Sequence, residues 1–272
     1  MNLHTKTLLN NNTRMPVLGL GVFRAGEKTY QAVRDALDIG YRHIDTAMIY
    51  ENEQDVGRAI KDSGVPREEI FVTTKLWNDD MRARRVEKAF EESLKNLAME
   101  YVDLYLIHWP VIDEFVNSYK VMEGIYAKGK AKAIGVSNFQ PHHLETLMQN
   151  CDIVPAVNQI ETHPYLTNEE AVEYCKRKNI APESWSPIAK GKILNDSKLL
   201  DLADKYNKTV AQIAIRWHLQ RGLIVIPKSV NKSRILENSQ VFDFELSSED
   251  MRLISSLNKN MRMGSHPDKF DF

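Results

Sequence analysis

The stretch that decides the fold is Ile70-Phe71-Val72-Thr73-Thr74-Lys75-Leu76-Trp77, a short run of apolar and β-branched residues with a lysine near its end. This composition is typical of a parallel strand that is buried on both faces. A lysine in such a strand is costly to bury unless another group pairs with it. The stretch therefore predicts both a buried strand and a partner for Lys75.

Two other strand-like stretches also end in polar groups. One runs from His43 to Ala47, carries Asp45 and is followed shortly by Tyr50; the other ends in His108. Neighbouring parallel strands end at the same side of a sheet or barrel, and in barrels the functional residues lie at that side. We therefore expect these three side chains to meet Lys75 there.

Strand and helix patterns alternate around these stretches. Helical spacing, as at Val33, Ala36 and Leu37, recurs between short apolar runs, and the count is eight strand-then-helix units. Eight such units in 272 residues predict an α/β fold of one domain, residues 1–272, built as a single (β/α)8 TIM barrel. The turn signal Asn10-Asn11-Asn12 predicts a short N-terminal β-hairpin that caps the barrel floor.

The composition argues against several classes of protein. Lys and Arg total 36 against 37 Asp and Glu, a balance that gives no bias toward nucleic acid or a membrane surface. No apolar run approaches the ~20 residues of a membrane span, and the first residues lack a signal-peptide core. The two cysteines, Cys151 and Cys175, are consistent with reduced thiols in a cytoplasmic protein. No metal-ligand spacing stands out, so no metal site is predicted.

The four polar residues at the strand ends suit proton transfer to an oxygen atom. A free tyrosine has a pKa of ~10, and an ammonium about 4 Å away would lower that pKa to about 7. Lys75 is therefore expected to lower the pKa of Tyr50, with Asp45 orienting Lys75. His108 would hold the same oxygen by a hydrogen bond. This arrangement suits carbonyl reduction, and because no side chain supplies a hydride, a nicotinamide cofactor is implied.

A cluster of cations lies later in the chain. Lys228 and Arg234 bracket a hydroxyl-rich turn, Ser229 to Ser233, at the start of a predicted helix. A helix N-terminus with two cations suits a dianionic phosphate. This cluster favours NADPH over NADH.

The motifs resemble those of the aldo-keto reductase superfamily over nearly the whole chain, with its bacterial 2,5-diketo-gluconate and methylglyoxal reductases the nearest group. They are Gly40–Ala47 with Tyr50, Thr74–Trp77, Leu106–Pro110, Gly135–Phe139 and Ile226–Ser229. The resemblance implies reduction of small aldehydes, ketones, dicarbonyls or sugar-derived ketones with NADPH/NADP+. It also implies that Tyr50 is the proton donor, that Asp45 and Lys75 adjust the pKa of Tyr50, and that His108 orients the carbonyl.

The resemblance further implies a set of cofactor contacts. These are Ser137, Asn138 and Gln159 at the nicotinamide amide, Trp185 with Ser186 and Pro187 at the nicotinamide ring, Lys228, Ser229 and Arg234 at the 2′-phosphate, and Glu237 and Asn238 at the adenine. Phe23, where many members have Trp, would wall the substrate pocket with Trp77 and Trp109. The loop after Pro110 and the tail after Leu257 are short, which predicts an open pocket.

Two other functions remain open. Lys75 could form a Schiff base in a barrel lyase, although Asp45 would keep it protonated. The chain could also be a non-catalytic, NADPH-binding sensor or regulatory subunit, although the intact set of four polar residues argues against it. The expected partner is a small carbonyl substrate, without nucleic acid or membrane. A closed barrel has no free sheet edge, so a monomer is expected.

Overall fold

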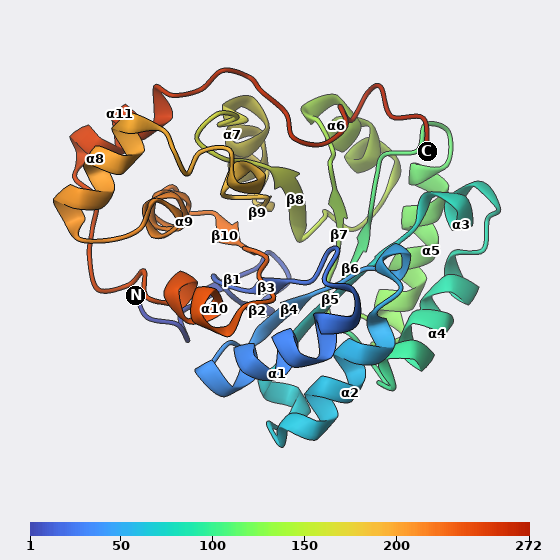
Figure 1. The fold of residues 1–272 in the computed structure, drawn as a ribbon. Helices are drawn as coiled ribbons and strands as arrows, with labels where there is room; N and C mark the ends of the chain where they lie inside the picture. The colour runs from blue at the N-terminus through green and yellow to red at the C-terminus, as the bar shows by residue number, and fades with distance from the viewer.

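Eight parallel strands form one sheet in the computed structural model, which describes residues 1–272 (Figure 1). The order is β10-β9-β8-β7-β6-β5-β4-β3. The strands are β3 (Leu20–Gly21), β4 (His43–Asp45), β5 (Phe71–Leu76), β6 (Leu104–Ile107), β7 (Ile134–Ser137), β8 (Val157–Glu161), β9 (Ala181–Trp185) and β10 (Ile224–Val225).

The sheet closes on itself. Parallel bridges join Leu18 to Val225 and Gly21 to Lys228, at the two outer strands of that order. The predicted (β/α)8 barrel is confirmed. As predicted for the deciding stretch, every residue of β5 is buried, because the barrel interior lies on one side of it and helices lie on the other.

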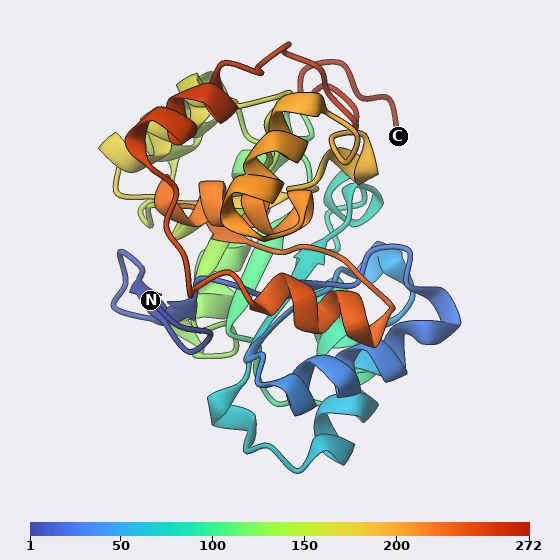
Figure 2. The same cartoon turned by 60° about the vertical axis from the view of Figure 1, so that its left-hand side comes forward.

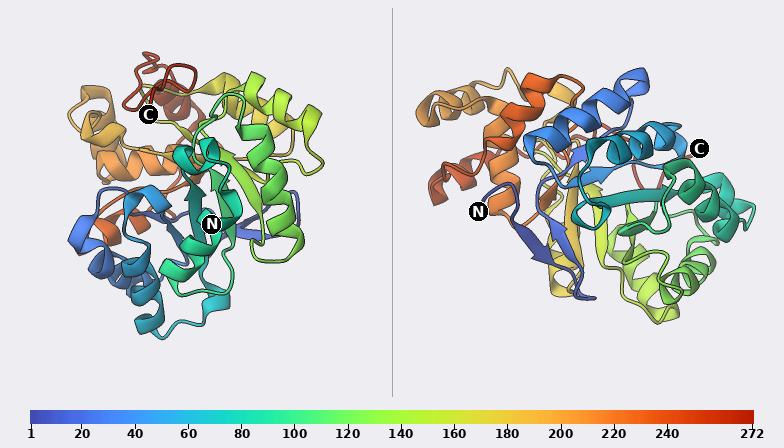
Figure 3. Two further views of the ribbon diagram at one scale, coloured as in Figure 1. Left: turned by 90° about the vertical axis from the view of Figure 1, so that its right-hand side faces the viewer. Right: turned by 90° about the horizontal axis from the view of Figure 1, so that it is seen from below.

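Helices surround the strands (Figures 1 and 3). Those that follow the strands in turn are α1 (Thr29–Ile39), α2 (Glu53–Ser63), α4 (Val86–Leu97), α5 (Phe115–Ala127), α6 (Pro141–Asn150), α7 (Glu169–Arg177), α9 (Val210–Gln220) and α10 (Lys232–Ser239). The additional ones are α3 (Asn78–Arg82), α8 (Ser197–Tyr206), α11 (Ser248–Ser255) and the 3₁₀ turns η1 (Gly26–Lys28), η2 (Met48–Tyr50), η3 (Arg67–Glu69) and η4 (Ala189–Gly191). Helices α8, α9 and α11 pack together on one side (Figure 2). None of the helices combines the length and apolar character needed to cross a lipid bilayer.

The predicted hairpin consists of β1 (Lys6–Leu8) and β2 (Arg14–Pro16), which pair antiparallel. Asn10 and Asn11 donate side-chain hydrogen bonds to the main-chain oxygens of Pro155 and Lys132, just before β8 and β7 begin. The hairpin therefore covers the amino-terminal ends of the strands, which form the floor.

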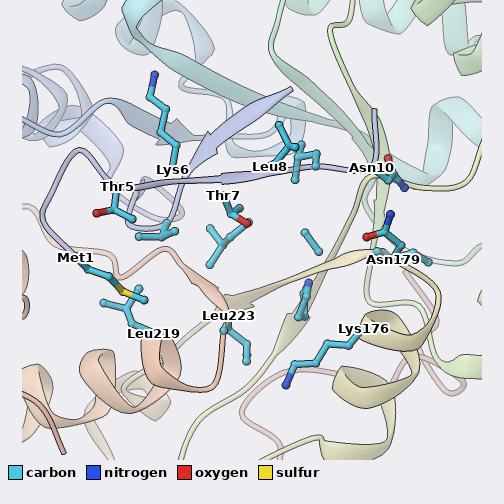
Figure 4. Close-up of a pocket in the computed structure, with 17 residues that line it drawn as sticks. Met1, Thr5, Lys6, Thr7, Leu8, Asn10, Lys176, Asn179, Leu219 and Leu223 are labelled. Carbon is cyan, nitrogen blue, oxygen red and sulfur yellow. The ribbon is translucent and has the colours of Figure 1, made fainter. Parts of the chain in front are cut away.

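A cavity of about 390 Å³ lies between this hairpin and the last residues of α7 and α9 (Figure 4). Lys6, at its border, extends away from the other lining side chains. The remaining lining is mainly apolar, with Leu9, Val17 and Ile224 among its residues. The cavity lies at the end of the barrel opposite the polar strand ends.

Candidate active site

The four polar residues predicted to meet at the strand ends do so. Asp45 is the last residue of β4, Lys75 lies near the end of β5, His108 follows β6 and Tyr50 ends η2. The Lys75 Nζ lies 2.6 Å from Asp45 Oδ1 and 5.1 Å from the centre of the Tyr50 ring. The rings of Tyr50 and His108 meet edge to face, with centroids 5.7 Å apart.

The buried lysine has the partner that the sequence predicted. Both Lys75 and Asp45 are buried, and the Lys75 ammonium also donates to the main-chain oxygen of Thr46 at 2.8 Å. Burial by itself would lower the pKa of Lys75, but Asp45 and Tyr50 outweigh burial and raise that pKa. Lys75 is therefore a charged ammonium in the barrel interior.

The expectation that Lys75 would bring the pKa of Tyr50 below its ordinary value is wrong for this structure. Burial raises the pKa of Tyr50, and Lys75 offsets that rise only in part. The half-buried phenol thus holds its proton across the neutral range. What Lys75 contributes is a positive charge beside the oxygen from which the proton would leave.

His108 is a neutral imidazole. Burial, and then the Lys75 ammonium, keep its pKa well below the ordinary value of 6.5. Its Nδ1 has no hydrogen-bond partner, and its ring packs edge-on against Trp77 with centroids 5.2 Å apart. A neutral imidazole carries one N–H, which is enough to donate to a carbonyl oxygen.

Of the residues expected at the nicotinamide amide, Ser137 and Asn138 lie at the end of β7, and Gln159 lies in the middle of the adjacent strand β8. Asn138, in the left-handed region at φ 64°, donates to the His108 main-chain oxygen at 3.0 Å and to Ser137 Oγ at 3.1 Å. The Trp185 Nε1 donates to Asn138 Oδ1 at 2.9 Å. Gln159 donates to Asp45 Oδ2 at 2.7 Å. The last of these bonds joins the Gln159 amide to the Asp45–Lys75 pair.

The strand end at Trp185 continues into a constrained turn. Ser186, directly after it, is in the left-handed region at φ 52°, and Pro187 is buried. A Cβ on Gly264 would lie 2.5 Å from Cη2 of Trp185, so the tail backbone lies against the indole. The indole orientation is therefore determined by Asn138 on one side and Gly264 on the other.

The predicted anion site lies at the start of α10. Lys228 and Arg234 are exposed, and neither forms an ion pair. Ser229 Oγ accepts from the Asn231 N–H at 3.1 Å, and Asn231 in turn caps the helix through the Ser233 N–H. The site thus offers two free cations, a hydroxyl group and a helix N-terminus, which suit a phosphate.

The two residues expected at the adenine lie near the end of α10. The Glu237 carboxylate accepts from the Thr209 hydroxyl at 2.8 Å, and Asn238 is buried. Glu237 is thus already engaged by Thr209, the N-cap residue of α9.

Sequence reasoning missed a third cation in this region. Lys28, in η1, is close enough to Lys228 that its charge, after burial, helps to lower the pKa of Lys228. The two lysines come close because the barrel closes between β3 and β10. No local pattern around Lys28 indicates this.

The aromatic walls are present, and the C-terminal tail adds to them. Phe23 packs against Tyr50 with ring centroids 4.9 Å apart. Phe272 stacks parallel to Trp77 at 5.8 Å and meets Trp109 edge to face at 5.3 Å, and Phe270 also packs on Trp109. The tail crosses the structure from α11 to this point (red in Figure 1).

The expectation of an open pocket was drawn from the short loop after Pro110 and the short tail, and the structure shows that the tail lies at the mouth. Asn78 and Arg82 donate hydrogen bonds to the main-chain oxygen of Phe272 at 3.0 and 2.8 Å. Short as it is, the tail is anchored beside Trp77 and covers part of the mouth.

Comparison with known proteins agrees with this geometry. The model of the Aldo/keto reductase family matches residues 17–259. The chain belongs to the aldo/keto reductase family. Membership makes the protein an oxidoreductase with NADP(H) as its cofactor.

Several relatives of this aldo/keto reductase share about half of its residues. A glyoxal reductase of Bacillus subtilis is 50% identical over 266 residues, covering 97% of this chain and 96% of the relative. A methylglyoxal reductase of Escherichia coli is 49% identical over 267 residues, covering 96% of each chain.

Solved structures of the family are also similar. An aldo-keto reductase from a Medee basin deep-sea metagenome superposes with a TM-score of 0.95 at 50% identity, covering 98% of this chain and 100% of that one. The Bombyx mori aldo-keto reductase, solved in complex with NADP, gives a TM-score of 0.91 at 39% identity, covering 97% and 96%.

Proposed function

We propose that this aldo/keto reductase reduces small aldehydes and dicarbonyls to alcohols with NADPH, and that Tyr50 donates the proton. The observation that carries the proposal is the buried Lys75–Asp45 pair, which lies next to a protonated phenol and a neutral imidazole. The similarity to glyoxal and methylglyoxal reductases supports small dicarbonyls as the substrate class.

NADPH, when bound, supplies the hydride. Lys228 and Arg234 are the unpaired cations that would hold its 2′-phosphate. Ser137, Asn138 and Gln159 would orient the nicotinamide through its amide. With both Gln159 N–H groups directed at carboxyl groups, its Oε1 remains as an acceptor for an amide N–H.

The carbonyl oxygen would lie between His108 and Tyr50. As hydride reaches the carbonyl carbon, negative charge develops on the oxygen, and the His108 N–H donates to it. The Tyr50 O–H bond breaks and its proton completes the alcohol. The Lys75 ammonium stabilises the phenolate that remains, and Asp45 keeps Lys75 charged. The walls formed by Phe23, Trp77, Trp109 and Phe272 limit the access of water.

The test follows NADPH absorbance with glyoxal, methylglyoxal and a panel of larger aldehydes, for the native protein and Tyr50→Phe. The expected result is turnover by the native protein and a loss of about 10²–10⁴-fold in the variant. NADPH binding, measured by fluorescence, should be retained. Turnover by Tyr50→Phe at the native rate would contradict the role of Tyr50.

The same experiments decide between the alternatives. NADPH binding without turnover by the native protein would favour a sensor. Trapping of substrate on Lys75 by borohydride would favour a Schiff-base lyase, but the 2.6 Å pairing with Asp45 keeps the amine protonated and argues against it.

We also propose that the enzyme acts as a monomer in the cytoplasm. Closure of the sheet leaves no free strand edge for a partner, which supports a monomer. Cys151 and Cys175 are both free thiols, which supports a reducing compartment such as the cytoplasm.

A further inference from the structure

One buried carboxyl group lies behind the site and has no part in the mechanism above. Glu183 is the central residue of β9 and is fully buried in the barrel interior. Its Oε2 accepts a hydrogen bond from Gln159 Nε2 at 2.9 Å. Its Oε1 has no hydrogen-bond partner and lies 3.6 Å from Nε2 of His43, which also has none.

Gln159 connects this carboxyl group to the proposed proton donor. The same Nε2 that donates to Glu183 also donates to Asp45 Oδ2 at 2.7 Å. A primary amide has two N–H bonds, and each carboxyl group takes one. Asp45 then uses its other oxygen to hold Lys75. A continuous chain of contacts thus runs from Glu183 through Gln159 and Asp45 to Lys75.

The charges in the barrel interior determine whether the Glu183 carboxyl group is ionised. The groups that face it are His43 and Asp45 from β4, Lys75 from β5 and Gln159 from β8, with Tyr50 beyond Lys75. Lys75 is the one cation among them, and Asp45 already neutralises it. A second carboxylate would be buried without compensation, which is costly.

The pKa directions agree with that geometry. Burial, and then Asp45, raise the pKa of Glu183 to about 8. Burial, and then Lys75, lower the pKa of His43 to about 3. Near neutral pH, a carboxylic acid therefore faces an imidazole nitrogen that can accept a hydrogen bond.

We propose that Glu183, in its un-ionised form, is a positioning residue for the reduction, which acts through Gln159 on the Asp45–Lys75 pair. This inference rests on the proposed role of Tyr50. The acid fixes the Gln159 amide, and with it the carboxylate that orients Lys75. Loss of its proton places a second negative charge beside Asp45, which raises the pKa of Tyr50 and makes it a weaker acid. Turnover should therefore fall as the pH rises through about 8.

The first test compares pH profiles of kcat for methylglyoxal reduction in the native protein and Glu183→Gln. Glutamine has the same shape as the acid, cannot ionise, and can donate to His43 while it accepts from Gln159. The native kcat should decline up to tenfold per pH unit above about 8, and this decline should be absent from Glu183→Gln or displaced by at least one pH unit. Glu183→Leu, which cannot hold Gln159, should reduce kcat at every pH.

Glu53→Gln is the matched control. Glu53 is also a buried carboxyl group, but it accepts from Thr74 and Asn96 outside this chain of contacts. Its replacement should leave the alkaline decline of kcat as in the native protein. An alkaline decline that persists unchanged in Glu183→Gln would overturn the proposal.

A second readout needs no turnover. The infrared spectrum of the native protein, labelled with isotopic glutamate, should contain the carbonyl stretch of an un-ionised carboxyl group that disappears as the pH rises through about 8. The band should be absent from Glu183→Gln. Absence of the band from the native protein at pH 6 to 7 would overturn the proposal even if the variant did not fold.

Different results would contradict the proposed function and the proposed role of Glu183. If Tyr50→Phe reduces methylglyoxal as fast as the native protein, the proposed function is wrong. If Tyr50→Phe is inactive but Glu183→Gln keeps the native pH profile, only the role of Glu183 is wrong.

Discussion

At the scale of single residues, the site depends on a lysine that remains charged in a barrel interior. Lys75 is fully buried and its charge is balanced by Asp45 at 2.6 Å. Removing one partner of such a pair leaves an uncompensated buried charge, which costs more than the pair contributes. The residue proposed to support proton transfer is thus also one on which folding depends.

Lys75→Met tests both roles. The free energy of unfolding should fall by about 3–5 kcal/mol, because Asp45 is left buried and unpaired. Denaturant unfolding measures this loss, and NADPH oxidation with methylglyoxal should fall by at least 10²-fold. Lys88→Met is the control, since Lys88 forms only an exposed pair with Glu92 at 3.8 Å. Its effect on unfolding should stay within about 0.5 kcal/mol.

Glu183 should make stability depend on pH. Its pKa is raised from 4.5 to about 8 in the folded state, so the folded protein keeps a proton that the unfolded chain loses. The resulting stabilisation is complete below pH 4.5 and is lost as the pH rises to about 8. The slope is at most about 1.4 kcal/mol per pH unit for one proton. Urea unfolding of Glu183→Gln between pH 5 and 8 should have a flatter dependence than the native protein, and equal slopes would contradict this.

At the scale of elements, the C-terminal tail, residues 258–272, determines much of the mouth. It contains no helix or strand, and its position depends on side chains of the barrel. Glu161 accepts hydrogen bonds from the main-chain N–H groups of Met263 and Gly264. The tail also contacts Trp185 through Gly264 and Asn78 through Phe272, and these contacts determine the path of its backbone. An irregular segment can therefore form a pocket wall when its backbone polar groups are satisfied by side chains.

Phe272→Ala should change which carbonyls are preferred. Phe272 packs against Trp77 and Trp109 at the pocket mouth, where its ring would stack on an aromatic substrate, a contact worth about 0.5–1.5 kcal/mol. The ratio kcat/KM should fall roughly 5- to 10-fold for aromatic aldehydes and change little for glyoxal. Leu200 is exposed on α8, and Leu200→Ala should leave kcat/KM unchanged both for aromatic aldehydes and for glyoxal. Equal losses for both substrates would show that the ring does not select between them.

Gly264→Ala should weaken NADPH binding. The added Cβ would lie 2.5 Å from the Trp185 indole, so the tail or the indole must move. Because Trp185 is expected at the nicotinamide ring, the Kd for NADPH, measured by fluorescence titration, should rise. Gly124→Ala is the matched control, since its Cβ meets nothing within 4 Å on helix α5. That control should gain about 0.5–1 kcal/mol of stability and keep the native Kd.

At the scale of the whole molecule, closure of the barrel brings together two cations at the predicted anion site. Lys28 follows β3 and Lys228 follows β10, which are the two strands joined by closure. Burial, and then the charge of Lys28, lower the pKa of Lys228, and a phosphate bound between the two lysines would offset their repulsion. The preference for NADPH is thus expected to depend on the intact barrel as well as on the loop itself.

Arg234→Ala should reduce the preference for NADPH over NADH. The Kd for NADPH should rise by about tenfold or more and depend less on salt, because a charge-assisted contact worth about 1.5–3 kcal/mol is lost. The Kd for NADH should change little. Lys232→Ala is the control, because Lys232 already pairs with Asp35 at 3.4 Å. Parallel losses for both cofactors would contradict a 2′-phosphate contact at Arg234.

The barrel and the four polar residues at its mouth could be predicted from the sequence because their signals are local. A buried parallel strand has a characteristic composition, and the residue at its end occupies the same side of any such barrel. The two cations Lys228 and Arg234 could also be predicted from a local signal, because they flank a hydroxyl-rich turn at the start of a predicted helix. Resemblance to a known family added the expected roles of individual residues, which remain predictions.

Only the tertiary structure decided the properties that depend on distant segments. Gln159 meets Asp45 across 114 positions of sequence, and Phe272 meets Asn78 across 194. The pKa of Tyr50 rises because burial is a property of the packed interior, which the spacing of Asp45, Tyr50 and Lys75 does not reveal. Glu183 shows the same limit: in the sequence it is a carboxylate within a strand, and in the barrel it becomes a buried acid because the single nearby cation is already neutralised.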